Sequence, residues 1–203
     1  MWVSGEARGS QAETEIGRRA RMLLRIWQGL KGEHTAAFRG DLDLRQLPRL
    51  VQWLFIAEPG REGGFTWRLA GTGITQFLGH EVTGSDLLAG WDRFERGVIG
   101  RSLAAVAQRH DCALLRLRYL TDRGETAEAE MLALPMLARD RESTHVLGGL
   151  FPKADTPLRP YQRLEPSQIG AARLLAEDDL SVAALGAQAR RKFQVISGGL
   201  DDR

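Results

Sequence analysis

The sequence predicts an α+β domain built on an antiparallel sheet. Two observations lead to this class. Strand-like runs come first as a pair and later as a group of three, with helical patterns between the two groups, and turn residues separate neighbouring runs. Strands grouped apart from helices and joined by short turns are typical of α+β domains. The chain has 203 residues, of which 43% are hydrophobic, so it can bury one sizeable core.

The first two strands are expected at 51–57 and 65–70. The first run is short, apolar and aromatic, the second alternates between apolar and polar residues, and the glycine-rich segment 59–64 predicts a turn between them. The two runs therefore form an antiparallel hairpin. A short helix over 74–78 and a longer one over 91–109 follow, because apolar residues recur there at helical spacing.

Three further strands are expected at 112–121, 125–134 and 145–151, where short runs of strand character are bounded by turn residues. Together with the first hairpin they make a sheet of five strands. The domain then covers residues 42–153.

The loop Asp122-Arg123-Gly124 predicts a three-residue hairpin turn with Gly124 in the left-handed region. Such a loop places Thr121 opposite Glu125 and thereby sets the register of two strands. The other cross-strand pairs are then Arg118 with Glu128, Arg116 with Glu130, Tyr119 with Ala127, Leu117 with Ala129 and Leu115 with Met131.

The N-terminal part is expected to be disordered over 1–13 and to form an amphipathic helix over 14–31. One face of this helix carries an apolar seam, formed by Ile16, Ala20, Leu23, Trp27 and Leu30. We expect the seam to make a homodimer contact. Packing on the chain's own sheet is the alternative, because an amphipathic stripe does not by itself choose its partner. Binding to a membrane surface through the arginines is a third option.

The C-terminal part, 154–203, is expected to be a proline-marked linker and a helical extension, with helical patterns over 167–176 and from Ser181 onward. A helix-turn-helix over 167–192 would make the chain a DNA-binding regulator, which is the second functional hypothesis. The acidic turn argues against it, as does a presumed recognition helix that is poor in base-reading side chains. The net charge of +2 excludes binding of nucleic acid by charge alone.

Residues that could carry chemistry do not combine into a known kind of site. Gly71-Thr72-Gly73 lacks the third glycine of a dinucleotide-binding fingerprint, and Cys112 has no evident activating partner. None of the four histidines has the spacing of a metal ligand: His34, His80, His110 and His145.

Glu128 and Glu130 share one face of a strand, as a pair of catalytic acids could. Arg116 and Arg118 have the same spacing on the preceding strand, so we interpret all four as cross-strand ion pairs. No catalytic residue and no metal ligand is predicted, and an enzyme that uses a cavity of the domain ranks last among the hypotheses.

The composition also favours a cytoplasmic protein without a transmembrane segment. No apolar run approaches the roughly 18 residues of a membrane helix, and the N-terminus lacks the apolar region of a secretory signal. A single cysteine cannot form an internal disulfide.

The segment 68–84, RLAGTGITQFLGHEVTG, resembles the signature of a bacterial branch of the PAS sensory superfamily, whose members are often stand-alone proteins. That branch shows a strand ending in R-L-x-G-T, a short helix, a glycine, and an acidic–apolar–T/R–G step. A leucine-rich stretch with a tryptophan follows, as in 87–91 here. Leu47-Pro48 upstream, and Pro135 and Gly148-Gly149 downstream, also fit.

The resemblance implies a PAS-like sheet of five antiparallel strands with short helices over one face. It further implies a sensory or regulatory module in signal transduction, without catalysis of its own. Such a module would act through homodimerisation and a signalling partner, with or without a small ligand. The N-C-R-F-L-Q stretch of photoreactive flavin relatives is absent, and neither His80 nor His110 is a persuasive haem ligand, so the cofactor stays unknown.

A ligand of such a domain would lie between sheet and helices. The cavity would be lined by aromatic and apolar residues, namely Trp53, Phe55, Trp67, Leu69, Phe77, Trp91, Leu115 and Met131. The alternative is a filled core made of the same side chains, because aromatic residues at strand spacing usually pack against one another.

Overall fold

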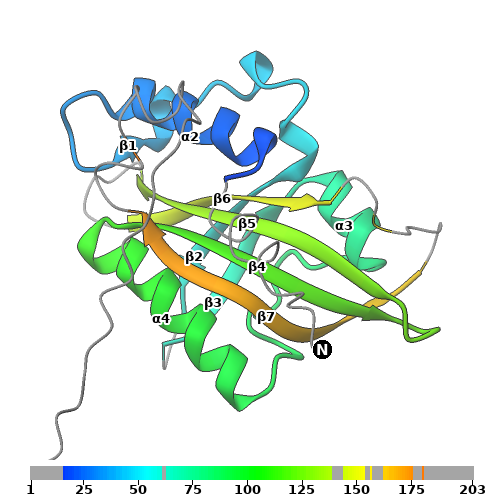
Figure 1. Cartoon of the computed structure of the whole chain (residues 1–203). Helices are drawn as coiled ribbons and strands as arrows, with labels where there is room; N and C mark the ends of the chain where they lie inside the picture. The colour runs from blue at the N-terminus through cyan, green and yellow to red at the C-terminus, as the bar shows by residue number, and fades with distance from the viewer. Residues whose placement is uncertain are drawn as a thin grey trace, which may run out of the picture.

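The computed structural model describes residues 16–60, 63–138, 144–153, 156, 162–175 and 180. Within these residues, one sheet of seven strands carries helices on both faces (Figure 1). In chain order the helices and strands are α2 (Arg18–Lys31), β1 (Ala37–Phe38), β2 (Leu54–Pro59), β3 (Phe65–Ala70), α3 (Thr72–Leu78), α4 (Arg93–Arg109), β4 (Cys112–Thr121), β5 (Thr126–Leu137), β6 (Thr144–Pro152) and β7 (Leu164–Leu175). Three short 3-10 turns precede β2: η1 (Arg39–Asp41), η2 (Leu44–Gln46) and η3 (Val51–Trp53). The turn η3 replaces the first three residues of the strand expected at 51–57.

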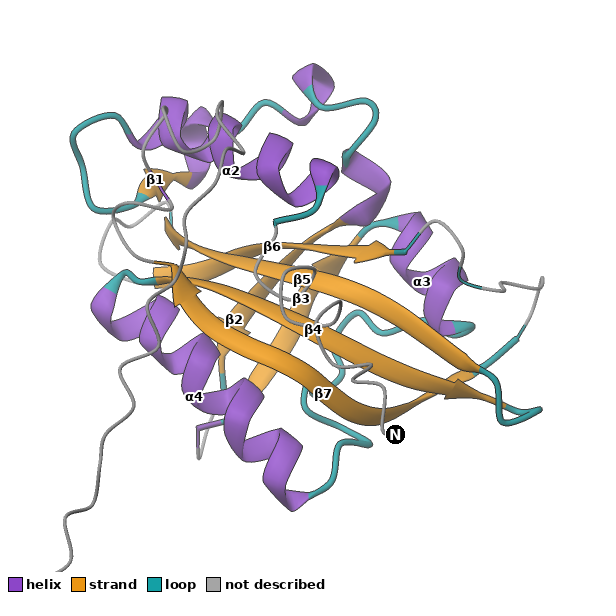
Figure 2. Ribbon diagram, in the orientation of Figure 1, coloured by secondary structure: helices purple, strands orange, loops and turns teal. Residues whose placement is uncertain are grey.

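Six strands follow one another in the order β3-β2-β6-β5-β4-β7, and every neighbouring pair is antiparallel. The short strand β1 pairs in parallel with the end of β5. Helices α3 and α4 cover one face of the sheet and α2 covers the other (Figure 2). Each face has its own apolar core, represented by Phe55 and Leu115 beneath α3 and α4 and, on the other face, by Leu23 of α2 and Leu132 of β5. The α+β class with an antiparallel sheet is confirmed, although the sheet is larger than the five strands expected.

Strand β7 replaces the first helix of the expected C-terminal extension. Gln168 to Leu175, expected as part of a helix over 167–176, pair instead with Cys112–Arg118, and Leu164 to Pro166 pair with the rest of β4. This pairing satisfies the backbone groups along an edge of β4 that would otherwise lie open. The pairing skips Ser167 and Gly170, which form bulges, so the strand lacks the period-two alternation that would reveal it in the sequence.

A helix-turn-helix over 167–192 is therefore wrong, because its first helix is a strand of the sheet. The second pattern, from Ser181 onward, lies outside the described residues, as does the segment 1–13 that was expected to be disordered.

Helix α2 packs on the chain's own sheet through the apolar seam. Ile16, Ala20, Leu23 and Trp27 are buried in the second core and Leu30 packs against it. The indole nitrogen of Trp27 donates to the Pro135 carbonyl of β5 at 2.8 Å. This corrects the assignment of the seam to a homodimer contact, because these side chains are covered by the sheet while α2 is docked.

The start of α2 is held by a carboxylate of β5. The backbone amide of Gly17 donates to the two carboxylate oxygens of Glu130 at 3.0 and 3.2 Å. An anion at the exposed amides of a helix N-terminus is favourable, because those amides have no partner within the helix. The seam and this contact together fix where α2 lies.

The hairpin between β4 and β5 has the expected loop and register. The Thr121 amide donates to the Glu125 carbonyl at 2.9 Å, and Gly124 has a φ of 76°. Leu115, Leu117 and Tyr119 pair as expected on the helix side, with Met131, Ala129 and Ala127. On the other face Arg118 lies 3.0 Å from Glu128, and Arg116 lies 4.0 Å from Glu130.

A β-bulge changes the direction of one predicted cavity residue. Ile56 pairs with Leu69, but the next residue, Ala57, pairs with Trp67, so Arg68 is left between two paired positions. Trp67 therefore faces the core beneath α3 and α4, whereas Leu69 lies with Ile56 on the opposite face. Leu69 is 37% exposed, so it does not belong to a cavity beneath these helices.

Replacing Glu130 or Glu128 by glutamine should change the pH dependence of stability in opposite directions. Burial raises the pKa of the Glu130 carboxyl. The charge of Glu130 therefore destabilises the folded state at pH values above the raised pKa. Below the ordinary glutamate pKa the carboxyl is protonated in both the folded and the unfolded state, so it does not affect stability. Lys153 and Arg118 lower the pKa of the Glu128 carboxyl. The charge of Glu128 therefore stabilises the folded state at pH values above the ordinary glutamate pKa. This stabilisation is lost as the pH falls through the lowered pKa.

Relative to the wild type, Glu130→Gln should gain stability as the pH rises through the raised pKa. Glu128→Gln should lose stability as the pH rises toward the ordinary glutamate pKa from below. Urea unfolding of the three proteins at a series of pH values measures both differences. Two variants that shift in the same direction would contradict the assigned environments.

Candidate functional site

The space between the sheet and helices α3 and α4 is filled by side chains over most of its length. Phe55, Phe77, Leu115 and Met131, four of the expected cavity residues, are buried together in the first core. The ring centroids of Phe55 and Trp67 lie 4.9 Å apart in an edge-to-face arrangement, which is a favourable packing geometry. Open space is found instead at the two ends of this layer.

The first opening, which we call the Tyr119 pocket, has a volume of about 400 Å³. It lies between β3, the segment 78–91, β4 and the beginning of β7. Its lining includes Trp67, Leu87, Trp91, Tyr119, Arg163 and Pro166. A volume of this size is sufficient for a small organic molecule.

Tyr119 is the polar group most deeply set in this pocket. Its side chain comes from β4 and is only 5% exposed, with the rings of Phe77 and Trp91 each 5.5 Å away. Its hydroxyl makes no hydrogen bond with any of the described residues. Burial raises the pKa of Tyr119, so the hydroxyl keeps its proton at neutral pH and can donate it to a ligand.

The wall opposite Tyr119 is tied to helix α4. The Asp86 carboxylate accepts from the Leu88 amide at 2.9 Å and pairs with Arg96 at 2.8 Å. Arg96 also donates to the Leu88 carbonyl at 2.9 Å. The same segment runs beside β3, where the Trp67 amide donates to the Ser85 carbonyl at 3.0 Å. These contacts hold the wall in one position without using the Tyr119 hydroxyl.

Another wall is the segment that leads into β7. Gly79 caps the end of α3 with a φ of 77°, and a Cβ atom there would lie 2.1 Å from the Gln162 carbonyl oxygen. The two segments therefore touch without room for a side chain. Arg163 and Glu165 follow at the mouth of the pocket, where both are exposed and neither forms an ion pair with the described residues.

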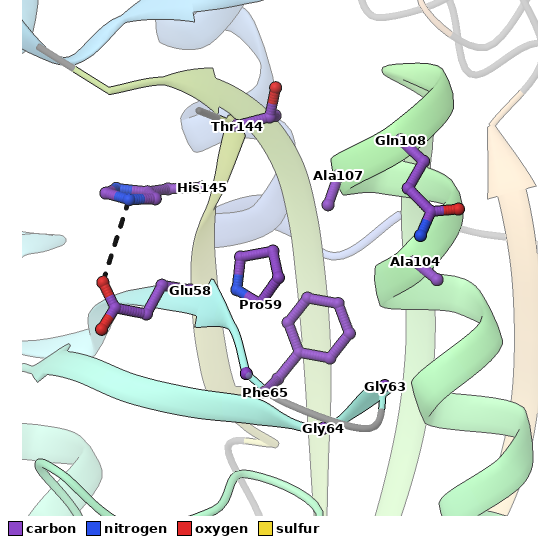
Figure 3. A pocket seen from close by; sticks show the side chains of 11 residues that line it. Glu58, Pro59, Gly63, Gly64, Phe65, Ala104, Ala107, Gln108, Thr144 and His145 are labelled. Carbon is purple, nitrogen blue, oxygen red and sulfur yellow. Dashed lines mark ion pairs between the residues drawn. The ribbon is translucent and has the colours of Figure 1, made fainter. Parts of the chain in front are cut away.

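The second opening, which we call the hairpin groove, has a volume of about 590 Å³ and lies between the β2–β3 hairpin, α4 and the start of β6. Figure 3 shows Pro59 and Phe65 directed toward Ala104 and Ala107 of α4, with Gln108 farther along the helix. The groove therefore combines apolar side chains with polar ones, because Glu58, Thr144 and His145 also line it.

Charged groups at the hairpin groove pair with each other. The imidazole of His145 lies 3.9 Å from the Glu58 carboxylate, and Arg68 lies 3.8 Å from the same carboxylate (Figure 3 shows the first pair). His110, nearby in sequence to the end of α4, hydrogen-bonds to Thr35 and Thr144 through its two ring nitrogens. These contacts give each imidazole a structural partner.

A family model described as a PAS domain matches residues 17–151. The chain belongs to the PAS domain family. This membership indicates a sensory or regulatory role in signalling. Among curated proteins, no sequence matches the chain. No helix in the described part is long and apolar enough to cross a membrane.

The PAS match begins at residue 17 and therefore includes α2, which the expected domain of 42–153 leaves out. It ends at residue 151, within β6, so strand β7 lies beyond it. One wall of the Tyr119 pocket, Arg163 to Pro166, is thus contributed by residues outside the PAS match.

Sequence reasoning placed two of eight expected cavity residues in this pocket, Trp67 and Trp91. Trp53 is half-buried and lies between the two cores, with the guanidinium of Arg19 5.4 Å from its ring centroid. Tyr119 was missed as a pocket residue, although it shares the apolar face of β4 with Leu115 and so could have been included.

The three residues that the sequence offered for catalysis, Cys112, Glu128 and Glu130, are buried or paired in this PAS domain. Burial raises the pKa of Cys112 to about 12, so the thiol stays protonated and unreactive. Glu128 and Glu130 face Arg118 and Arg116, as the ion-pair interpretation predicts. Among the described residues, no group of three or more His, Cys, Asp or Glu side chains could hold a metal ion.

Gly79→Ala should destabilise the protein more than Gly124→Ala. Both glycines have nearly the same φ, 77° and 76°, so both variants bear the strain of the left-handed region, roughly 1–2 kcal/mol. A Cβ atom added at Gly79 would collide with Gln162, whereas a Cβ atom added at Gly124 would have no other atom within 4 Å. Urea unfolding measures both costs, and equal costs would show that the α3–β7 contact is not close.

Tyr119→Phe should leave the free energy of unfolding unchanged or raise it by up to about 1 kcal/mol, because the lost hydroxyl has no partner to leave behind. Tyr119→Ala, by contrast, should cost about 3–5 kcal/mol, since it removes the buried ring as well. Chemical denaturation compares the two variants. A loss above about 1 kcal/mol for the phenylalanine variant would mean that the hydroxyl is already hydrogen-bonded within the fold.

Proposed function

We propose that this PAS protein is a non-enzymatic, cytoplasmic sensor or regulator in signal transduction. In this proposal a small molecule binds in the Tyr119 pocket and changes how the chain associates with a second protein, either another copy of itself or a signalling partner. The observation that carries the proposal is the pocket itself: it measures about 400 Å³ and is lined by a buried tyrosine whose hydroxyl has no hydrogen-bond partner among the described residues. The described residues do not fully enclose that hydroxyl, so a ligand or water that enters the pocket can supply the partner.

The position of the pocket supports a role in signalling. Its walls come from four separate parts of the chain, so a ligand that contacts all of them would hold those parts together. One of them, β7, continues along the whole of β4 and ends at Leu175 in the core beneath α2. Beyond β7, the Leu180 carbonyl accepts a hydrogen bond from Gln28 of α2. One strand thus joins the pocket to the helix on the far face.

Within the described ranges, the candidate nucleophiles considered above are not paired with a base, which supports the non-enzymatic part of the proposal. Tyr119 keeps its proton, Cys112 lies in the other core, and the paired glutamates of β5 lie on the face away from the pocket. A single cysteine, which cannot form an internal disulfide, supports the reducing cytoplasm as the location.

The test is to purify the full chain, denature it and measure the mass of any small molecule released. Wild-type protein should release one, and Ala89→Trp should not, because Ala89 is exposed and lines the pocket, where an indole would occupy the space. Gln76→Trp is the matched control, since Gln76 is exposed on α3 and lies outside the pocket lining.

Sedimentation velocity then compares the loaded wild-type protein with Ala89→Trp and Gln76→Trp. A changed association state or a changed affinity for a partner in Ala89→Trp alone supports the proposal. If wild-type protein releases nothing beyond what Ala89→Trp releases, the small molecule has no place in the function. If release differs but association does not, the pocket binds a ligand without regulating assembly.

A further inference from the structure

We propose that the ligand of the Tyr119 pocket is a neutral, flat aromatic molecule with a hydrogen-bond acceptor that receives the proton of Tyr119. The inference rests on the proposed function and adds the chemical class of the ligand. It also makes Tyr119 the residue that sets specificity.

Aromatic surface favours a flat ring as the occupant. Trp67, Trp91 and Tyr119 all line the pocket, and each is at least nine-tenths buried. Leu87 and Pro166 add apolar surface between them. Rings that meet edge to face or offset gain about 0.5–1.5 kcal/mol beyond the burial of their area, so an aromatic ligand binds better here than an aliphatic one of equal size.

The hydroxyl of Tyr119 favours an acceptor on that ring. It keeps its proton because burial raises its pKa, and no described residue accepts from it. A ligand carbonyl, ether or ring nitrogen that reaches it takes the place of water at the hydroxyl, whereas a pure hydrocarbon displaces that water and leaves the hydroxyl without a partner.

Charge at the pocket favours a neutral molecule. Asp86 is neutralised by Arg96, and the exposed pair at the mouth, Arg163 and Glu165, brings one charge of each sign. His80, also exposed at the mouth, donates from its Nδ1 atom to the Leu78 carbonyl at 3.1 Å. No unbalanced charge lies beside Tyr119, so a charged group in the interior of the pocket would lose its hydration without a counter-ion.

Three probes of nearly equal size separate these requirements. Acetophenone has both the ring and the acceptor, ethylbenzene has only the ring, and cyclohexyl methyl ketone has only the acceptor. Saturation-transfer NMR titrations on the full chain measure their dissociation constants for the wild type, Tyr119→Phe, Ala89→Trp and Gln76→Trp.

Acetophenone should bind wild-type protein most tightly and lose roughly threefold to tenfold on Tyr119→Phe, the range expected for one hydrogen bond. Ethylbenzene should bind both proteins equally, since it makes no bond to the hydroxyl. Comparing the two ligands on the two proteins forms a double-mutant cycle, which isolates the hydrogen bond from any general effect of the substitution. Binding of all three probes should be lost in Ala89→Trp and kept in Gln76→Trp.

The remaining outcomes overturn the inference in distinguishable ways. If Ala89→Trp abolishes binding but Tyr119→Phe affects ketone and hydrocarbon alike, Tyr119 does not select the ligand, and the proposed function stands. If the cyclohexyl ketone binds as tightly as acetophenone, the aromatic requirement is wrong, and again the pocket stands. If no probe binds in a manner sensitive to Ala89→Trp, and the purified protein also releases no small molecule, both the inference and the proposed function fail.

Discussion

Strand β4 is hydrogen-bonded along both of its edges, to β5 on one side and to β7 on the other, and the rest of the structure depends on this double pairing. Because side chains alternate along a strand, the register of β4 decides which residues face which helix. Leu115, Leu117 and Tyr119 face the core beneath α3 and α4, whereas Arg116 and Arg118 meet the glutamates of β5 on the opposite face. A shift of one residue would place the arginines in the apolar core and remove Tyr119 from its pocket.

The sequence predicted the structure correctly where neighbouring residues in the chain determine it. The loop ending at Gly124 determines the β4–β5 register, so every pair from Thr121 back to Leu115 could be written down in advance. Two other features could not be predicted from the sequence, because each depends on a partner strand elsewhere in the chain. Strand β7 has a helical spacing of apolar residues and two bulges, and only the open edge of β4 makes it a strand. Leu69 changes face because of the bulge in β3, which no pattern within that short strand signals.

The seam of α2 illustrates the same limit in another form. Its amphipathic pattern correctly predicts a helix with one buried face, but a pattern does not say which surface buries it. The polar contacts at its two ends resolve the question: Gly17 on Glu130 and Trp27 on Pro135 both join α2 to β5 of the same chain. The sheet therefore has an apolar core on each face, and both cores share the central strands β2, β5 and β6.

This arrangement explains how a ligand at one end of the domain could influence the far face. Bulky side chains such as Phe55 and Phe77 fill the middle of the layer, so the space for a ligand lies at its edge, beside the residues that begin β7. A molecule bound there stabilises whichever arrangement of the pocket walls it contacts, by an amount that grows with its concentration relative to its dissociation constant. Because β7 is a continuous strand from Leu164 to Leu175, that stabilisation acts on both its pocket end and the end that packs beneath α2. Residues beyond the PAS match thus line part of the pocket and reach the core beneath α2, so in the proposed function β7 is the element that would couple binding to association.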